Sequence, residues 1–277
     1  MKAWQSEGGE AAATGTGVRI WVINLDRAPE RWARVCAQLD RLGLPYERLP
    51  AVDARQFTPQ QRALLDEATY RRRHGMSPLG GELGCYLSHV QAMQCLLASD
   101  AAAALVLEDD VLLTERLPAA LDGLMRHPHR WDMVKMSAVH SGTPQPVLEV
   151  APGQHLSVML SRCTGSSAYL MNRRAAQAYA AGLLPMTLPY DHVFDQGWTF
   201  GLKVRLLTPT PCVHDEETAS TIGTPAGQPS RKFPWWKRGS TYAYRLRNEF
   251  ARLRYGLTET GRERRQGSAG RPVSPPA

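Results

Sequence analysis

Three consecutive carboxylates, Glu108, Asp109 and Asp110, follow an apolar run in the segment 103–113 (AALVLEDDVLL). A short apolar run bounded by polar residues predicts a buried strand, and the end of such a strand lies at the edge of an α/β sheet where these folds bind ligands. Because three adjacent negative charges repel one another, the cluster needs a compensating cation, and Mg²⁺ or Mn²⁺ prefers oxygen ligands of this kind. The triplet therefore indicates a divalent-metal site, with a solvated acidic turn as the alternative.

The elements that must position this triplet begin as a β-α-β unit. Residues 18–25 predict a strand, Pro29 opens a helix with one apolar face, and residues 46–49 predict a second strand. Such units build parallel sheets with ligands at the carboxyl ends of the strands. The remaining pattern predicts helices over 58–70, 82–98, 114–125 and 173–181, strands over 131–136, 156–161, 166–171, 203–207 and 212–214, and a long loop over 140–155.

Length and composition set further bounds. With 277 residues, 43% hydrophobic and 21% charged, the chain has the make-up of a soluble globular protein with a sizeable core. No stretch approaches the ~20 apolar residues that span a bilayer. Residues 1–17 contain no apolar signal region and are expected to be a disordered leader. Five scattered cysteines without a C-x-x-C spacing are typical of a cytoplasmic protein, where each is a small buried apolar residue.

Charge is distributed unevenly along the chain. Residues 230–277 carry a net charge of +9, whereas residues 1–229 carry −2, within a total of +7. This asymmetry argues against a uniformly basic nucleic-acid-binding surface and makes nucleic acid an unlikely partner.

The basic segment 230–257 also carries an apolar stripe. An amphipathic helix with basic flanks and adjacent tryptophans is typical of a segment that lies on an anionic membrane. RNA binding and a C-terminal helix packed on the domain are the alternatives. Residues 258–277 are expected to be disordered. The stripe consists of Tyr242, Leu246, Phe250, Leu253 and Leu257, with Trp235 and Trp236 preceding it.

Three ordered segments resemble glycosyltransferase family 25, the group of lipopolysaccharide β-galactosyltransferases and collagen galactosyltransferases. They are INLDRAPER (23–31), GELGCYLSH (81–89) and LEDD (107–110), followed by GSSAYLMNRRAA (165–176), LPYDHVFDQ (188–196) and ETASTIG (217–223). The resemblance covers residues 18–225. It implies a GT-A-like fold, an α/β domain over 18–229 with a mostly parallel central sheet flanked by helices, that binds a nucleotide-sugar.

The resemblance also implies a cofactor. In this family an acidic motif usually holds Mn²⁺, and Glu108 and Asp110 match that motif, so Mn²⁺ or Mg²⁺ is expected on them. The role of Asp109 stays open between the metal, the sugar hydroxyls and a structural contact. His214 is a candidate further ligand because neutral imidazole suits Mn²⁺, although family members often carry glutamine near this position; a surface histidine is the alternative.

Donor-binding residues are expected around the first strand and the GELGCYLSH helix. Guanidinium groups bind phosphate in a bidentate manner, and an acid after the second strand can accept from ribose or uracil. For the residues of the helix, a helix-dipole contact and satisfied core hydrogen bonds are the alternatives. The donor-binding candidates are Asn24, Arg27, Arg31, Asp53, Glu82, Ser88 and His89, with Asp109.

The family transfers sugar with inversion, so the acceptor hydroxyl needs a general base. Asp191 matches the late acidic segment of the family, and Asp195 is the reserve because i and i+4 share one helical face. The sequence thus predicts a UDP-dependent hexosyltransferase, for galactose in preference to glucose, acting on lipooligosaccharide or a related glycan at the cytoplasmic face of the inner membrane. The rivals are a non-catalytic nucleotide-sugar-binding protein and a nucleic-acid-binding protein that acts through its tail.

Overall fold

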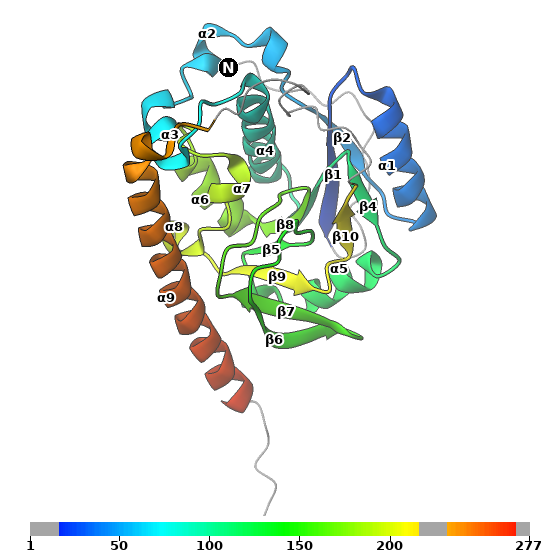
Figure 1. Ribbon diagram of the computed structural model, residues 1–277. Helices are drawn as coiled ribbons and strands as arrows, with labels where there is room; N and C mark the ends of the chain where they lie inside the picture. The colour runs from blue at the N-terminus through cyan, green and yellow to red at the C-terminus, as the bar shows by residue number, and fades with distance from the viewer. Residues whose placement is uncertain (1–16, 216–231, 270–277) are drawn as a thin grey trace, which may run out of the picture.

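Residues 17–215 and 232–269 are described in the computed structural model of the chain (Figure 1). The predicted leader, apart from Gly17, and the segment ETASTIG lie outside the described residues, as do residues 270–277.

An eight-stranded sheet forms the centre of the fold. Six strands point in one direction, and only β7 and β8 run the opposite way. The predicted mostly parallel sheet is therefore confirmed. In spatial order the strands are β2 (Glu47–Pro50), β1 (Val18–Asn24), β3 (Ala103–Glu108), β8 (Ala168–Asn172), β5 (Met133–Lys135), β9 (Val204–Thr208), β7 (Gln154–Met159) and β6 (Pro144–Ala151).

Helices cover both faces of this sheet (Figure 1). On one face lie α1 (Pro29–Arg41) and α5 (Leu117–Arg126), and on the other α4 (Gly80–Ala98) and α6 (Arg173–Gly182). Side chains alternate along a strand, so Ile20 and Val22 of β1 belong to the first core, whereas Trp21 and Ile23 belong to the second. Strands buried on both faces read as continuous apolar runs, which is why β1 and β3 could be predicted from the sequence.

Two predicted elements differ in the structure. The helix expected over 58–70 is divided into α2 (Pro59–Arg62) and α3 (Glu67–His74), because Leu64 and Leu65 pair with Met186 and Asp66 caps the new helix. The loop expected over 140–155 contains β6. This strand lies at the sheet edge and is half exposed, so it lacks the apolar run that reveals a buried strand.

Short elements complete the fold. A two-stranded antiparallel sheet pairs β4 with β10, next to the end of β3. Their bounds are β4 (Val111–Leu113), β10 (Cys212–His214), α7 (Tyr190–Val193), α8 (Gly197–Phe200), η1 (Ala54–Gln56), η2 (Pro128–Arg130) and η3 (Trp235–Lys237).

Helix α9 (Gly239–Ala269) is longer than the sequence predicted. Disorder was expected from residue 258, but the helix continues through residues 258–269 (Figure 1). Along its whole length, α9 contacts α3, α8, β6 and β7. The physical reason lies in Glu259 and Glu263, which are buried and both pair with Arg205 of β9 at 2.8 Å. A polar run without an apolar stripe looked disordered because the arginine that orders it lies far away in the sequence.

Substitution of Arg205 tests this anchor. Arg205→Met leaves two buried carboxylates with fewer compensating charges, and breaking a buried pair from one side costs about 3–5 kcal/mol. We expect the free energy of unfolding, measured by urea denaturation, to fall by about that amount. Arg254→Met, on the exposed side of the same helix, is the control and should change it by no more than ~0.5 kcal/mol. Equal midpoints for the two variants would contradict the anchoring role.

Candidate active site

A cavity of about 510 Å³ opens at the carboxyl ends of β1, β2 and β3. Parallel strands bring their carboxyl ends to one edge, so segments distant in the sequence meet there. Eleven of the thirteen predicted site residues line it: Arg27, Arg31, Asp53, Glu82, Ser88, His89, Glu108, Asp109, Asp110, Asp191 and His214. The other two, Asn24 and Asp195, do not.

Asp109 is held by its neighbours on β1 and α1. Its carboxylate accepts a hydrogen bond from Asn24 Nδ2 at 2.6 Å and forms an ion pair with Arg31. Arg31 also pairs with Asp110 at 3.0 Å and is largely buried. Of the roles left open for Asp109, these contacts favour the structural one. They also make Arg31 a compensating charge for the acidic cluster, and its role in donor binding stays a prediction.

Asp110 is the strongest candidate for a metal ligand. It is almost buried, and its Oδ1 atom makes no hydrogen bond to any described residue. Pairing of β4 with β10 brings His214 opposite Val111, so that His214 Nδ1 lies 3.8 Å from Asp110 Oδ1. Burial, reinforced by the charge of Glu108, raises the pKa of Asp110 to about 6. An orphaned carboxylate oxygen beside an imidazole fits a divalent cation, which would relieve this unfavourable charge.

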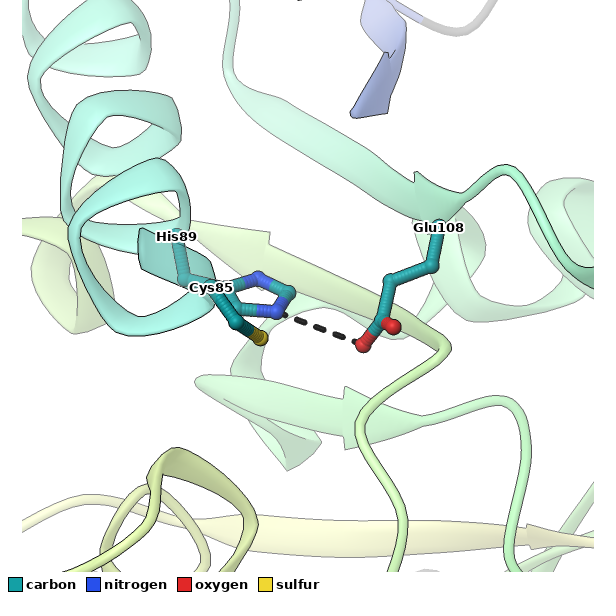
Figure 2. A group of neighbouring side chains, drawn as sticks. All are labelled: Cys85, His89 and Glu108. Carbon is teal, nitrogen blue, oxygen red and sulfur yellow. Dashed lines mark ion pairs between the residues drawn. The ribbon is translucent and has the colours of Figure 1, made fainter. Parts of the chain in front are cut away.

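Glu108 points toward α4, where its carboxylate faces His89 (Figure 2). Its Oε1 lies 3.4 Å from His89 Nε2 and accepts a hydrogen bond from the Ser166 hydroxyl at 2.9 Å. Burial opposes ionisation of Glu108, but His89 and Ser166 outweigh it and hold the pKa of this carboxyl below its usual value. His89 is itself fixed by Tyr169 OH at 3.0 Å from Nδ1.

Cys85 completes a second group of possible ligands. Cys85 and His89 lie one turn apart on α4, and the sulfur, the imidazole and the Glu108 carboxylate have ligand atoms within 4.8 Å of one another (Figure 2). Cys85 lines the cavity and is only partly buried, unlike the small core residue that the sequence predicted. Thiolate, imidazole and carboxylate are the donors that zinc prefers. The predicted metal residues thus belong to two neighbouring groups. Asp110 and His214 form one, and Glu108 lies in the other, the Cys85 corner, with Cys85 and His89.

This division predicts that the Cys85 corner binds a metal ion separately from Asp110 and His214. Zn²⁺ should bind the Cys85 corner, and Cys85→Ser should weaken that binding by about tenfold or more, because the thiolate is the softest donor present. Competition with a fluorescent zinc indicator measures this affinity. Cys36→Ser, a cysteine outside the cavity lining, is the matched control and should leave it unchanged. Zinc affinity that is insensitive to Cys85→Ser would rule out this corner as a zinc site.

Asp53 organises two arginines at the rim of the cavity. Its Oδ2 accepts hydrogen bonds from Arg27 Nη1 at 2.6 Å and Arg55 Nη2 at 2.7 Å. The hydrogen bonds from Arg55, with that from Arg27, lower the pKa of Asp53. Both arginines line the cavity, so Asp53 orients two guanidiniums suited to a diphosphate. The sequence interpretation missed Arg55, although its position two residues after Asp53 was a signal.

Glu82 and Ser88 stabilise the loop and helix that frame the cavity. Glu82 accepts from the backbone N–H of Leu79 at 2.6 Å, which caps the start of α4. Ser88 donates to Gly84 O at 2.8 Å and accepts from Val52 N at 2.9 Å. A side chain at Gly84 would meet Val52 O at 2.6 Å, so glycine permits this close approach. These contacts match the structural alternatives considered for both residues.

Asp191 of α7 also lines the cavity. It lines in addition a second, adjoining hollow, together with Arg162 and His140. Burial raises the pKa of Asp191, although the charges of Lys135 and Arg162 offset part of this effect. A carboxylate whose pKa is raised is a stronger base than one in water. The expected role of Asp191 as general base stays a prediction, which its place in the cavity and its raised pKa favour.

Asp195 does not share this position. Helix α7 ends at Val193, so the predicted i, i+4 relationship on one helical face does not form. Asp195 is 2% exposed and forms a two-pronged ion pair with Arg252 of α9, at 2.8 and 3.3 Å. This prediction was wrong because Arg252, the partner that holds Asp195, lies on a helix far away in the sequence.

Comparison with known proteins identifies the family. Residues 18–194 match the sequence profile described as "Glycosyltransferase family 25 (LPS biosynthesis protein)". The chain belongs to glycosyltransferase family 25. The matched range extends from β1 to α7 and contains every predicted site residue except Asp195 and His214. The proposal that His214 binds metal therefore depends on its geometry beside Asp110.

Relatives within family 25 are longer proteins. The chain is 34% identical over 125 residues to a "Glycosyltransferase 25 family member" of Aedes aegypti, which covers 42% of this chain and 20% of the relative. It is 27% identical over 135 residues to "Procollagen galactosyltransferase 2" of Homo sapiens, covering 46% and 22%. It is also 27% identical over 143 residues to a "Probable inactive glycosyltransferase 25 family member 3" of Rattus norvegicus, covering 48% and 25%. The chain thus spans about a quarter or less of these relatives.

Proposed function

We propose that this family 25 glycosyltransferase transfers a hexose, galactose in preference to glucose, from a UDP-sugar to a lipooligosaccharide or related glycan. Transfer proceeds with inversion and depends on Mn²⁺ or Mg²⁺. The observation that carries the proposal is the orphaned Asp110 Oδ1 beside His214, in a cavity whose rim holds two arginines. Galactose is supported by the name of the human relative, and the acceptor class by the description of the family.

The donor would lie between the arginines and the acidic cluster. Arg27 and Arg55, oriented by Asp53, bind the diphosphate. Asp110 and His214 would hold the cation, which would supply Lewis-acid stabilisation for negative charge on the departing diphosphate. Arg31 and Asn24 keep the carboxylate of Asp109 in place, and thereby fix the turn that presents Asp110.

The acceptor would enter from the hollow on the other side of Asp191. Asp191 accepts the proton of the attacking hydroxyl, which then displaces the diphosphate from the opposite face of the sugar. Arg162 lies in this hollow and helps keep Asp191 ionised between turnovers. Asp191, the proposed base, would therefore lie where the donor cavity and the acceptor hollow meet.

A donor and acceptor screen tests the proposal. UDP-galactose and UDP-glucose are incubated with lipooligosaccharide acceptors and Mn²⁺, UDP release is followed, and the anomeric configuration of the product is determined by NMR. We expect acceptor-dependent UDP release that stops when EDTA removes the metal, with an inverted product. Transfer that continues at the same rate in EDTA would contradict the metal assignment.

A non-catalytic nucleotide-sugar-binding protein is the second candidate, because one relative is named as probably inactive. The same screen separates the two functions when it is combined with calorimetric titration of UDP-galactose. Binding of the donor without UDP release, with any of the acceptors, would favour the non-catalytic function. The intact Asp110 and Asp191 in one cavity favour turnover.

A further inference from the structure

Helix α9 turns its apolar face away from the protein. Five large apolar residues spaced three or four apart form one face of the helix, and we call them the outer stripe: Tyr242, Leu246, Phe250, Leu253 and Leu257. With Trp235 and Trp236 of η3, they have exposed fractions of 42% to 73%. The stripe extends over about 22 Å of helix. Exposed apolar surface of this extent and continuity marks an interaction site.

The polar face of α9 is the one that packs on the domain. Arg252 pairs with Asp195, Thr241 donates to Arg72 O at 2.9 Å, and Tyr255 donates to Leu202 O at 2.7 Å. Gly256 permits close contact, because a side chain there would meet Met159 O at 2.8 Å. These specific contacts fix the rotation of the helix, so exposure of the outer stripe is built into the fold.

Basic residues flank one side of the outer stripe and its tryptophan end. Arg247, Arg254 and Arg265 follow one side of it, and Lys237 lies beside the two tryptophans. All four are exposed. Three acidic residues lie between positions 232 and 266. Glu259 and Glu263 are buried, so Glu249 alone among them can add negative charge to the surface of this segment. The face is therefore apolar at its centre and positive along one edge and at its tryptophan end.

We propose that the outer stripe, with Trp235 and Trp236, docks the protein on an anionic phospholipid surface. Leucine and phenylalanine side chains enter the acyl boundary, tryptophans lie at the headgroup level, and arginines contact lipid phosphates. Within residues 17–215 and 232–269, the helices lack the length and apolar character that a bilayer span requires. This inference concerns a surface separate from the cavity and does not depend on the proposed function.

Charge favours this occupant over two others. In a symmetric dimer the same patch meets itself, which would bring the arginines of one copy against those of the other, and like charges facing each other are unfavourable. Nucleic acid would satisfy the arginines but leave the leucines and Phe250 in contact with a polar backbone. An anionic membrane satisfies both the charges and the apolar centre.

Vesicle flotation with the full chain tests the proposal. The probes are vesicles of equal parts phosphatidylglycerol and phosphatidylcholine, and vesicles of phosphatidylcholine alone. We expect the protein to float with the first at least about tenfold more than with the second, because each basic residue near an anionic surface contributes on the order of a few-fold in affinity. Raising the salt concentration should weaken this difference.

A matched pair of double variants separates the stripe from general surface hydrophobicity. Leu246→Ser/Phe250→Ser removes the centre of the outer stripe. Leu112→Ser/Val213→Ser removes two apolar residues that are 45% and 49% exposed on β4 and β10. We expect the first to reduce flotation by about tenfold or more and the second to leave it unchanged. Circular dichroism and thermal unfolding confirm that both variants fold; both substitute exposed positions.

Three results would overturn the proposal. The first is wild-type protein that remains in solution with anionic vesicles, and the second is flotation of both double variants at the wild-type level. The third is a dimer, detected by light scattering, that only Leu246→Ser/Phe250→Ser dissociates while flotation is unaffected; it would assign the stripe to a second copy. Arg247→Gln/Arg254→Gln adds an independent test, because loss of two charges should reduce flotation by about tenfold and flatten its salt dependence.

Discussion

Asp110→Asn should abolish hexose transfer, with a loss of roughly a thousandfold or more, or about 4 kcal/mol of transition-state stabilisation. The reason is that Asp110 contributes the unpartnered buried oxygen beside His214, and an amide there loses the charge that holds a cation. Two measurements check this expectation: the rate of acceptor-dependent UDP release, and Mn²⁺ affinity by calorimetry. Both should fall together.

The same substitution should stabilise the metal-free protein. Asp110 has a pKa raised to about 6 by burial and by Glu108, so its ionised form is more costly in the folded chain than in the unfolded chain. This cost is present above the folded pKa and disappears as the pH falls below the unfolded value. Asparagine removes it, and the unfolding temperature without metal should rise by a few degrees. Asp100→Asn, at a 92% exposed carboxylate, is the control and should change neither activity nor stability.

Asp191→Asn should lower kcat by about 10² to 10⁴-fold while leaving the affinity for UDP nearly unchanged. Asp191 lines both the cavity and the adjoining hollow that is proposed to admit the acceptor, whereas Arg27 and Arg55 line the cavity but not the hollow. Its removal should therefore affect proton transfer and not donor binding. Steady-state kinetics with calorimetric titration of UDP separates the two quantities. A proportional loss of UDP affinity would instead assign Asp191 to the donor.

Asp195→Asn is the natural counterpart of Asp191→Asn, since it makes the same chemical change four residues away. It removes the main carboxylate partner of the buried Arg252 and leaves it only the longer contact with Glu249 at 3.8 Å, so the free energy of unfolding should fall by about 3–5 kcal/mol. The protein that remains folded should retain its kcat. If Asp195→Asn lowered kcat without lowering stability, the assignment of roles to these two aspartates would be reversed.

The acidic triplet shows what a local sequence pattern can predict and what it cannot. Its position after a buried strand was sufficient to predict a charged cluster at the edge of a sheet, because apolar runs and their ends are encoded by neighbouring residues. Its internal division was not predictable. Asp109 joins Arg31 and Asn24, Asp110 faces His214, and Glu108 faces His89. Each orientation depends on a partner that another element of the fold supplies.

The sequence by itself determined the β-α-β beginning, the α/β class, the family and eleven of the residues that line the cavity, because these follow from hydrophobic periodicity and short ordered motifs. Tertiary structure alone decided which side of α9 faces outward, that the helix continues to residue 269, and that Asp195 belongs to its anchor. The physical reason is the same in each case. An amphipathic pattern specifies that a helix has two faces, whereas the buried partners Arg205 and Asp195, distant in sequence, decide which face is covered.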